Sequence, residues 1–335
     1  EDPLVYTKSV VRDTGTGLVT RTGNLFTKDP VTGEERQITA YPTDGGWIYN
    51  DANGNNVMDG NETYRRILNP QFNGDGTQIL YTSDASGTFK AYRVAATTTA
   101  ANPALGVVKE FAGVDVRYAA WSPASDGKTT GTLAFTRAGT GKTELWTQDL
   151  ATGLVRQIVN AADQEVRHPV FTSGTQLAYI AVKGGIQDIR LVNADGTGAS
   201  ALTANAFPSP QYDRLLSSGR SATVRNLIYS RRSYLDFGYG QWDVYVHDIA
   251  GNNVYNVTNT PDTDEFGPCF HGDDTTAPPM GAGSGQMYYS NDPLGTGVAQ
   301  VWQTNYNISD PVSSNAPRAE RTGYDAGQAH WGPKP

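Results

Sequence analysis

Short runs of alternating apolar and polar residues fill the chain, separated by clusters of glycine, proline, asparagine and aspartate. Runs that are rich in β-branched and aromatic residues, with a period of two, predict strands bounded by turns. One set of four runs occupies 168–171 (HPVF), 177–180 (LAYI), 188–196 (DIRLVNADG) and 200–203 (SALT). This set predicts one unit of four antiparallel strands.

The same four runs recur along the chain, and their columns can be aligned. The first run carries an aromatic residue in each copy, at Phe72, Trp121, Phe171, Tyr212, Phe270 and Trp331. The second run reads Leu-x-Tyr-Thr or similar, at 4–7, 79–82, 133–136, 177–180, 227–230 and 287–290. The third run lies at 25–29, 91–94, 145–149, 189–193, 244–248 and 301–305, and the fourth at 36–39, 108–111, 156–159, 200–203, 255–258 and 319–322. Repeats at a period of a few tens of residues, each with four strands, predict an all-β, six-bladed β-propeller.

The two ends of the chain supply complementary fragments of one repeat. Residues 3–40 carry the second, third and fourth runs without a first, and residues 324–335 carry a first run with nothing after it. We therefore expect these two segments to form blade 1 together and to close the ring, with residues 1–335 as a single domain. Closure of this kind removes free sheet edges, which would otherwise pair with other chains.

Three stretches carry a resemblance to a known family: 72–76 (FNGDG), 121–127 (WSPASDG) and 188–203 (DIRLVNADGTGASALT). They resemble the Pro-Asp β-propeller repeats of the TolB type, and the resemblance covers essentially the whole chain. Blades 5 and 6 depart from it through long insertions. Such repeats occur in envelope scaffold proteins, in propeller domains of peptidases and in some polysaccharide lyases. The resemblance therefore implies a fold more strongly than any one activity.

Composition narrows the classes of function and the compartment. The formal net charge of −8 argues against nucleic-acid binding. No apolar stretch is long enough to span a membrane. The start, EDPLVY, reads like a mature N-terminus left after removal of a signal peptide, and lysine is scarce while threonine, asparagine and glycine are abundant. We expect a secreted, extracellular or periplasmic protein, in which the single Cys269 forms no internal disulfide.

The most specific chemical motif is an insertion at 45–64 that contains the sequence DANGNNVMDGNE at 51–62. Counting from its first residue, oxygen ligands fall at the spacing of an EF-hand-like calcium loop. They are the side chains of Asp51, Asn53, Asn55, Asp59 and Glu62 and the backbone carbonyl of Val57. The spacing predicts a Ca²⁺ site, with a solvated turn as the alternative. The loop resembles the isolated calcium loops of secreted bacterial proteins such as dockerins.

The loop between the second and third runs of blade 5, at 230–242, is rich in aromatic residues. Tyr234, Phe237, Tyr239 and Trp242 suit the anchoring of a protein partner or stacking on a sugar. The alternative is that they fold back over the edge of their own blade. The nearby arginines at 214, 220, 225, 231 and 232 predict a solvated basic face.

Candidates for catalysis are sparse. His168, His330 and Gln328 lie on predicted inner strands and His271 lies just past one, so a divalent metal near the channel is conceivable, as in propeller lyases. His247 falls on a third run and is predicted to lie at the surface. No G-x-S-x-G nucleophile motif occurs.

The sequence thus favours a non-catalytic, calcium-stabilised scaffold that binds another protein in an envelope or extracellular assembly. A metal-dependent polysaccharide lyase or hydrolase, and a carbohydrate-binding module, remain the alternatives.

Overall fold

The structure of the chain is a computed structural model. It describes residues 3–8, 10–13, 18–21, 24–29, 31–39, 67–84, 88–99, 106–107, 115–123, 125–139, 142–160, 162–216, 226–236, 238–260, 263–270, 284–293, 300–307, 319–320 and 326–331. Throughout these ranges the regular secondary structure is β-strand, which confirms the predicted all-β class. None of the described residues belongs to a helix long and apolar enough to cross a membrane.

The described strands form six four-stranded sheets and one two-stranded ribbon. In spatial order, sheet 1 is β26 (Ala326–Trp331), β1 (Leu4–Lys8), β4 (Leu25–Lys28) and β5 (Glu35–Gln37), and sheet 2 is β6 (Ile67–Phe72), β7 (Gln78–Ser83), β8 (Lys90–Ala95) and β9 (Gly106–Val107). Sheet 3 is β10 (Ala119–Trp121), β11 (Thr132–Ala138), β12 (Thr143–Asp149) and β13 (Val155–Val159), and sheet 4 is β14 (Glu165–Phe171), β15 (Gln176–Lys183), β16 (Ile186–Asn193) and β17 (Ser200–Ala201). Sheet 5 is β18 (Gln211–Leu216), β19 (Asn226–Leu235), β20 (Gly238–Asp248) and β21 (Asn253–Asn256), and sheet 6 is β22 (Thr263–Phe270), β23 (Ser284–Pro293), β24 (Gln300–Asn307) and β25 (Ala319–Glu320). The ribbon joins β2 (Val10–Asp13) to β3 (Leu18–Arg21), and every pairing is antiparallel.

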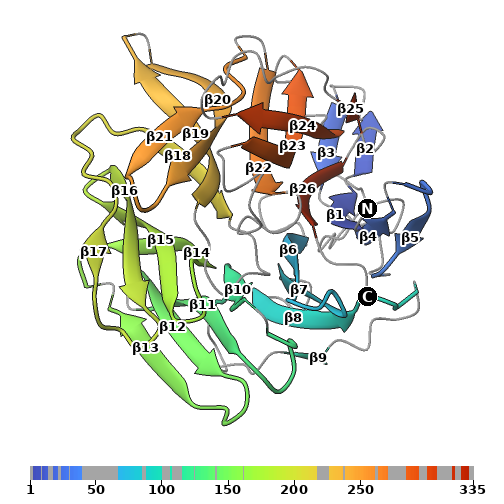
Figure 1. Cartoon of the computed structure of the whole chain (residues 1–335), viewed down its shortest axis with the longest axis horizontal. Coiled ribbons are helices and arrows are strands. Elements are labelled where there is room, and N and C mark those ends of the chain that lie inside the picture. Colours follow the sequence, from blue (N-terminus) through green and yellow to red (C-terminus); the bar gives the residue numbers. More distant parts are fainter. Residues whose placement is uncertain are drawn as a thin grey trace, which may run out of the picture.

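The sheets are arranged around a common centre, with the first strand of each sheet innermost and the fourth at the periphery (Figure 1). Two ends of the sheets follow from this order. We call the end that bears the second-to-third hairpins and the links between sheets the connector end. The opposite end, which bears the first-to-second and third-to-fourth hairpins, is the turn end.

The second run of each repeat supplies a large buried aromatic side chain. Its aromatic residue is at most 2% exposed in every sheet, at Tyr6, Tyr81, Phe135, Tyr179, Tyr229 and Tyr289. These rings pack in apolar clusters that each draw on neighbouring sheets: one joins sheets 3 and 4, and another joins sheets 5, 6 and 1. Because each such ring buries a large apolar area, its burial contributes roughly 1.5–3 kcal/mol. The Leu-x-Tyr alternation in the sequence is therefore the pattern of the core.

The threonine that ends the fourth run, as in SALT at 200–203, has a structural role in three of the sheets. The hydroxyls of Thr39, Thr203 and Thr258 accept hydrogen bonds of 2.8–2.9 Å from the backbone N–H groups of Leu25, Ile189 and Val244, the first residues of the third run. The same threonines donate to a side-chain oxygen nearby, such as Oδ1 of Asp188 or Asp243. The motif thus fixes the path of the fourth strand, where only a short ladder is formed.

The two ends of the described chain meet in sheet 1. β26 pairs with β1, so that Leu4 lies opposite Trp331 and Val5 opposite His330. The β2–β3 ribbon is inserted between β1 and β4, and the sequence reasoning did not anticipate it.

The strand register departs from the repeat alignment in sheets 5 and 2. Phe171 pairs with Leu177, the first residue of its second run, whereas Tyr212 pairs with Arg231, which follows the second run of sheet 5. The alignment of Tyr212 with the other first-run aromatics is therefore wrong, because Tyr212 lies several residues earlier in its strand than they do. In sheet 2 the fourth strand is Gly106–Val107, and the predicted run at 108–111 lies outside the described residues.

Candidate functional site

Several residues singled out in the sequence lie outside the described part of the structure. They include the whole insertion 45–64 with its calcium-loop residues, His271 and Phe237. Gln328 and His330 are described only as backbone in β26, and Tyr239 only as backbone in β20. The calcium site therefore stays a prediction.

The sheet 5 hairpin is the longest in the described structure, because β19 and β20 extend beyond their neighbours at the connector end. Tyr234 and Leu235, near its tip, are 47% and 55% exposed. Trp242 behaves differently: its ring lies 6.2 Å from that of Phe266 in sheet 6, and the Arg232 guanidinium stacks on it at 5.1 Å. Tyr234 is thus partly exposed to solvent, whereas Trp242 contacts the next sheet.

A second exposed aromatic residue lies at the same end and was missed by the sequence reasoning. Phe207 is 74% exposed and stands in the link from sheet 4 to sheet 5. It lies beside the β15–β16 hairpin, within van der Waals reach of Gly185. The link continues into Gln211, which pairs with Arg232 in β19. An aromatic residue in the proline-rich stretch 207–210 was the available signal.

A polar groove of about 690 Å³ lies beside the sheet 5 hairpin and is lined in part by the exposed Leu235. Its lining residues are Ser233, Leu235, Gly240, Gln241, Asp243, Tyr245, Asn256, Asn259 and Thr260. Asp243 is its most engaged acceptor, taking hydrogen bonds from the Asn256 amide, the Thr258 hydroxyl and the Thr260 backbone N–H at 3.0–3.2 Å. Hydrogen bonds to Asp243 thus hold the groove floor, and Leu235 is an exposed apolar residue of its lining. We call Phe207, Tyr234 and Leu235 the connector-end patch.

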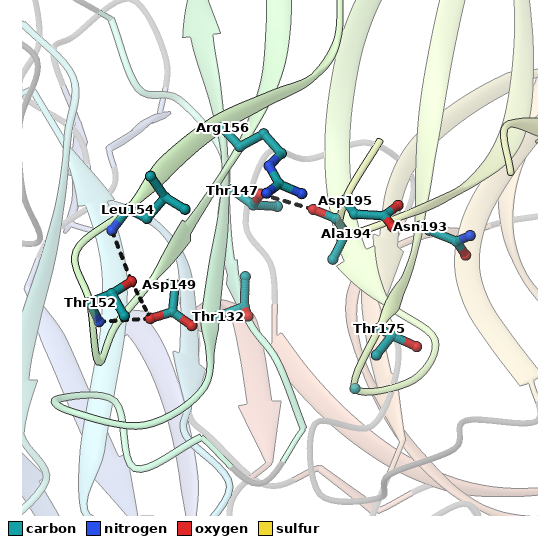
Figure 2. A pocket seen from close by; sticks show the side chains of 11 residues that line it. Thr132, Thr147, Asp149, Thr152, Leu154, Arg156, Thr175, Asn193, Ala194 and Asp195 are labelled. Carbon is teal, nitrogen blue, oxygen red and sulfur yellow. Dashed lines mark hydrogen bonds between the residues drawn. The ribbon is translucent and has the colours of Figure 1, made fainter. Parts of the chain in front are cut away.

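A groove of similar size, about 660 Å³, lies at the turn end between sheets 3 and 4. Figure 2 shows Asp149 and Thr152 on one wall and Asn193 and Asp195 on the other, with Arg156 extending toward Asp195. Asp149 accepts hydrogen bonds from the backbone N–H and the hydroxyl of Thr152, both at 2.7 Å. These bonds hold the pKa of Asp149 below its usual value. The carboxylate is thus committed to its own hairpin turn.

The innermost strands meet at a small central cavity with a volume of about 20 Å³. Sheets 1, 2, 4, 5 and 6 each carry a register shift in the first strand. At three of these bulges the residue before a proline has positive φ: Asn69 (54°), His168 (45°) and Gly267 (50°). Asparagine, histidine and glycine tolerate this region best among the residues. The repeated bulge turns this position away from the ladder.

His168 therefore occupies the cavity wall, with its ring centroid 4.0 Å from that of Tyr118. Burial, together with Arg214 and Arg167, holds the pKa of His168 well below its usual value. The ring is neutral at pH 7, but the neighbouring guanidiniums oppose any divalent cation placed beside it. Within the described residues no cluster of three or more His, Cys, Asp or Glu side chains is arranged to hold a metal.

Two sequence-based expectations in this region are wrong. Arg214 is 5% exposed, rather than part of a solvated face, because the bulge in β18 turns it inward. His247 is 0% exposed, rather than at the surface, because the turn after β20 covers it and Asn252 hydrogen-bonds its ring at 2.7 Å.

Comparison with solved structures identifies the class of fold. Over 99% of its length the chain is similar to TolB from Acinetobacter baumannii, with a TM-score of 0.61 and 16% identity, covering 67% of that chain. It is similar to a putative TolB from Agrobacterium tumefaciens (TM-score 0.56, 12% identity, covering 99% of each chain). It is also similar to a chain from a nidogen/laminin complex (TM-score 0.55, 10% identity, covering 99% of this chain and 98% of that one). No protein-family model matches the chain, and no curated protein sequence matches it.

The protein is thus a β-propeller, and its fold is TolB-like. At these low identities the likeness concerns the fold alone.

Proposed function

We propose that the chain is a six-bladed β-propeller that serves as a non-catalytic scaffold, binding another protein in an envelope or extracellular assembly. The six described sheets, the pairing of β26 with β1 and the cluster that joins sheets 5, 6 and 1 support the closed ring. The TolB-like fold supports a scaffold in the cell envelope.

One observation carries the binding role. Phe207, Tyr234 and Leu235 are about half exposed or more, and all belong to the connector end of sheets 4 and 5. Aromatic and aliphatic side chains that leave water on binding supply the energetic centre of a protein interface, and the adjoining polar groove would form its rim. The partner would therefore present an apolar anchor flanked by hydrogen-bonding groups.

Calcium binding at 51–62 is part of the proposal and rests on the ligand spacing in the sequence. Only three carboxylates contribute, so the affinity would suit the millimolar calcium found outside cells. A metal-dependent lyase is not proposed, because Arg214 and Arg167 surround His168.

Site-specific photo-crosslinking in the source cells tests the scaffold role. A photoreactive residue at position 234 or 235 should capture a discrete protein partner. The same residue at Val31 or Leu154, exposed by 66% and 60% in third-to-fourth hairpins at the turn end, should not. Equal capture from both ends, or none at 234 and 235, would contradict the proposal. Displacement of the captured protein by a soluble glycan would instead favour a carbohydrate-binding module.

A further inference from the structure

In the part of the chain that the structure describes, the central cavity contains a buried cation with an unpaired hydrogen-bond donor. Arg214 lines the cavity, is 5% exposed, and its Nη1 has no hydrogen-bond partner among the described residues. Burial lowers the pKa of Arg214 to about 10, which leaves the guanidinium charged at neutral pH. A buried charge of this kind is costly unless an opposite charge or a full set of acceptors compensates it.

Within the described structure, the charged groups around Arg214 compensate its charge only in part, through the attraction of Asp213. Arg167 is held by both carboxylate oxygens of Glu165, at 2.7 and 3.1 Å, and Arg117 by Asp115 at 3.0 Å. The nearest acid along the chain, Asp213, attracts Arg214 but takes its hydrogen bond from the backbone N–H of Gly267.

The cavity wall is rich in donors and carries no carboxylate. The polar side chains that line it are those of Asn69, Gln71, Tyr118, His168 and Arg214. The Oε1 of Gln71 accepts the Trp121 backbone N–H at 3.0 Å, and the amide N–H₂ of the same side chain is a donor. Neutral His168 adds an N–H, and Tyr118 a hydroxyl. A cavity of donors around a cation suits an acceptor with negative charge.

We propose that the central cavity binds a single monatomic anion, of which chloride is the abundant example, beside Arg214. The volume of about 20 Å³ accommodates one particle of roughly the size of a water molecule. It therefore excludes phosphate, sulfate and the carboxylate terminus of a peptide. The anion would neutralise Arg214 at the point where the inner strands of sheets 2, 3, 4 and 5 meet.

Thermal unfolding in sodium chloride and in sodium gluconate at equal ionic strength tests this site. An anion that binds only the folded protein stabilises it in proportion to the logarithm of its concentration. Above the Kd, each tenfold rise in chloride should add about 1.4 kcal/mol to the free energy of unfolding, whereas the bulky gluconate should not. The chloride dependence should vanish in Arg214→Met. It should persist in Arg117→Met, which removes an exposed arginine that does not line the cavity.

Chloride NMR on the wild-type protein gives a readout that does not depend on how the variant folds. Excess broadening of the chloride line that wild-type protein causes, and that competing bromide reverses, supports the site. Identical melting curves in the two salts, or no excess broadening, would mean that the cavity holds only water and would overturn the proposal.

Discussion

The two grooves of this propeller are nearly equal in volume, but the exposed side chains at the two ends differ in kind. At the turn end, Asp149 accepts two hydrogen bonds from Thr152 in its own hairpin turn. At the connector end, Asp243 likewise secures the groove floor, the exposed Leu235 lines the groove, and the exposed Tyr234 precedes it in the chain. The comparison indicates that a concave shape alone does not mark a functional surface here. Exposed aromatic side chains, Phe207 and Tyr234, distinguish the connector end, because Val31 and Leu154, which are exposed at the turn end, are aliphatic.

The largest expected effect is a loss of stability from a core substitution. It should not distinguish the turn end from the connector end, because the core is common to both. Tyr179→Ala empties a fully buried position between sheets 3 and 4 and should cost about 3–5 kcal/mol of unfolding free energy. Chemical denaturation measures it. Tyr179→Phe, which removes only the hydroxyl, is the matched control and should cost about 0.5–1.5 kcal/mol. Equal losses in the two variants would mean that the ring contributes little to the core.

Calcium should affect stability without distinguishing the two grooves. If the 51–62 loop binds Ca²⁺ only in the folded protein, a chelator should lower the melting temperature, and calcium at 100 times its Kd should restore about 2.7 kcal/mol. Melts of Asp51→Ala combined with Glu62→Ala, with and without chelator, are the control and should coincide. An unchanged wild-type melting temperature on chelation would rule out a stabilising site.

Surface substitutions should separate the two ends most sharply. Tyr234→Ser combined with Leu235→Ser should weaken partner binding at least tenfold while leaving the unfolding midpoint nearly unchanged, since both side chains are exposed. Val31→Ser combined with Leu154→Ser removes comparable apolar surface at the turn end and should leave binding intact. Binding isotherms with the crosslinked partner measure both. Equal loss in the two variants would remove the distinction between the ends.

The smallest effect should come from acid, and mainly at the turn end. Hydrogen bonds from Thr152 and Thr197 lower the pKa values of Asp149 and Asp195 below 3.8. A group whose pKa is depressed by folding stabilises the protein above its unfolded pKa and loses that contribution as pH falls through the folded value. Stability should therefore decline slightly below about pH 4. Asp149→Asn with Asp195→Asn should show a shallower decline, and an unaltered pH profile would contradict the assignment.

The sequence predicted the fold well because the core repeats. Each Leu-x-Tyr run combines strand periodicity with a large side chain, so Tyr81, Tyr179 and Tyr229 fall in equivalent buried places. The site was harder to predict, because it depends on local departures from the repeat. Arg214 turns inward only because β18 shifts register, and Phe207 matters only because its link leaves it exposed. The alternation of apolar and polar residues reveals neither the bulge nor the exposure of the link.

The bulge of the inner strands gives the repeat one position that the sheet does not use. Register relates Asn69, His168 and Gly267 to Tyr118, Arg214 and Gln328 in the other sheets. These are six different residues at one equivalent place, whereas the buried second-run aromatic is tyrosine in every sheet except sheet 3, where it is Phe135. Substitution there would change the chemistry of the centre while leaving the ladder and the core intact. The residues that line the centre of the propeller can therefore change without altering the strand pairing or the buried core.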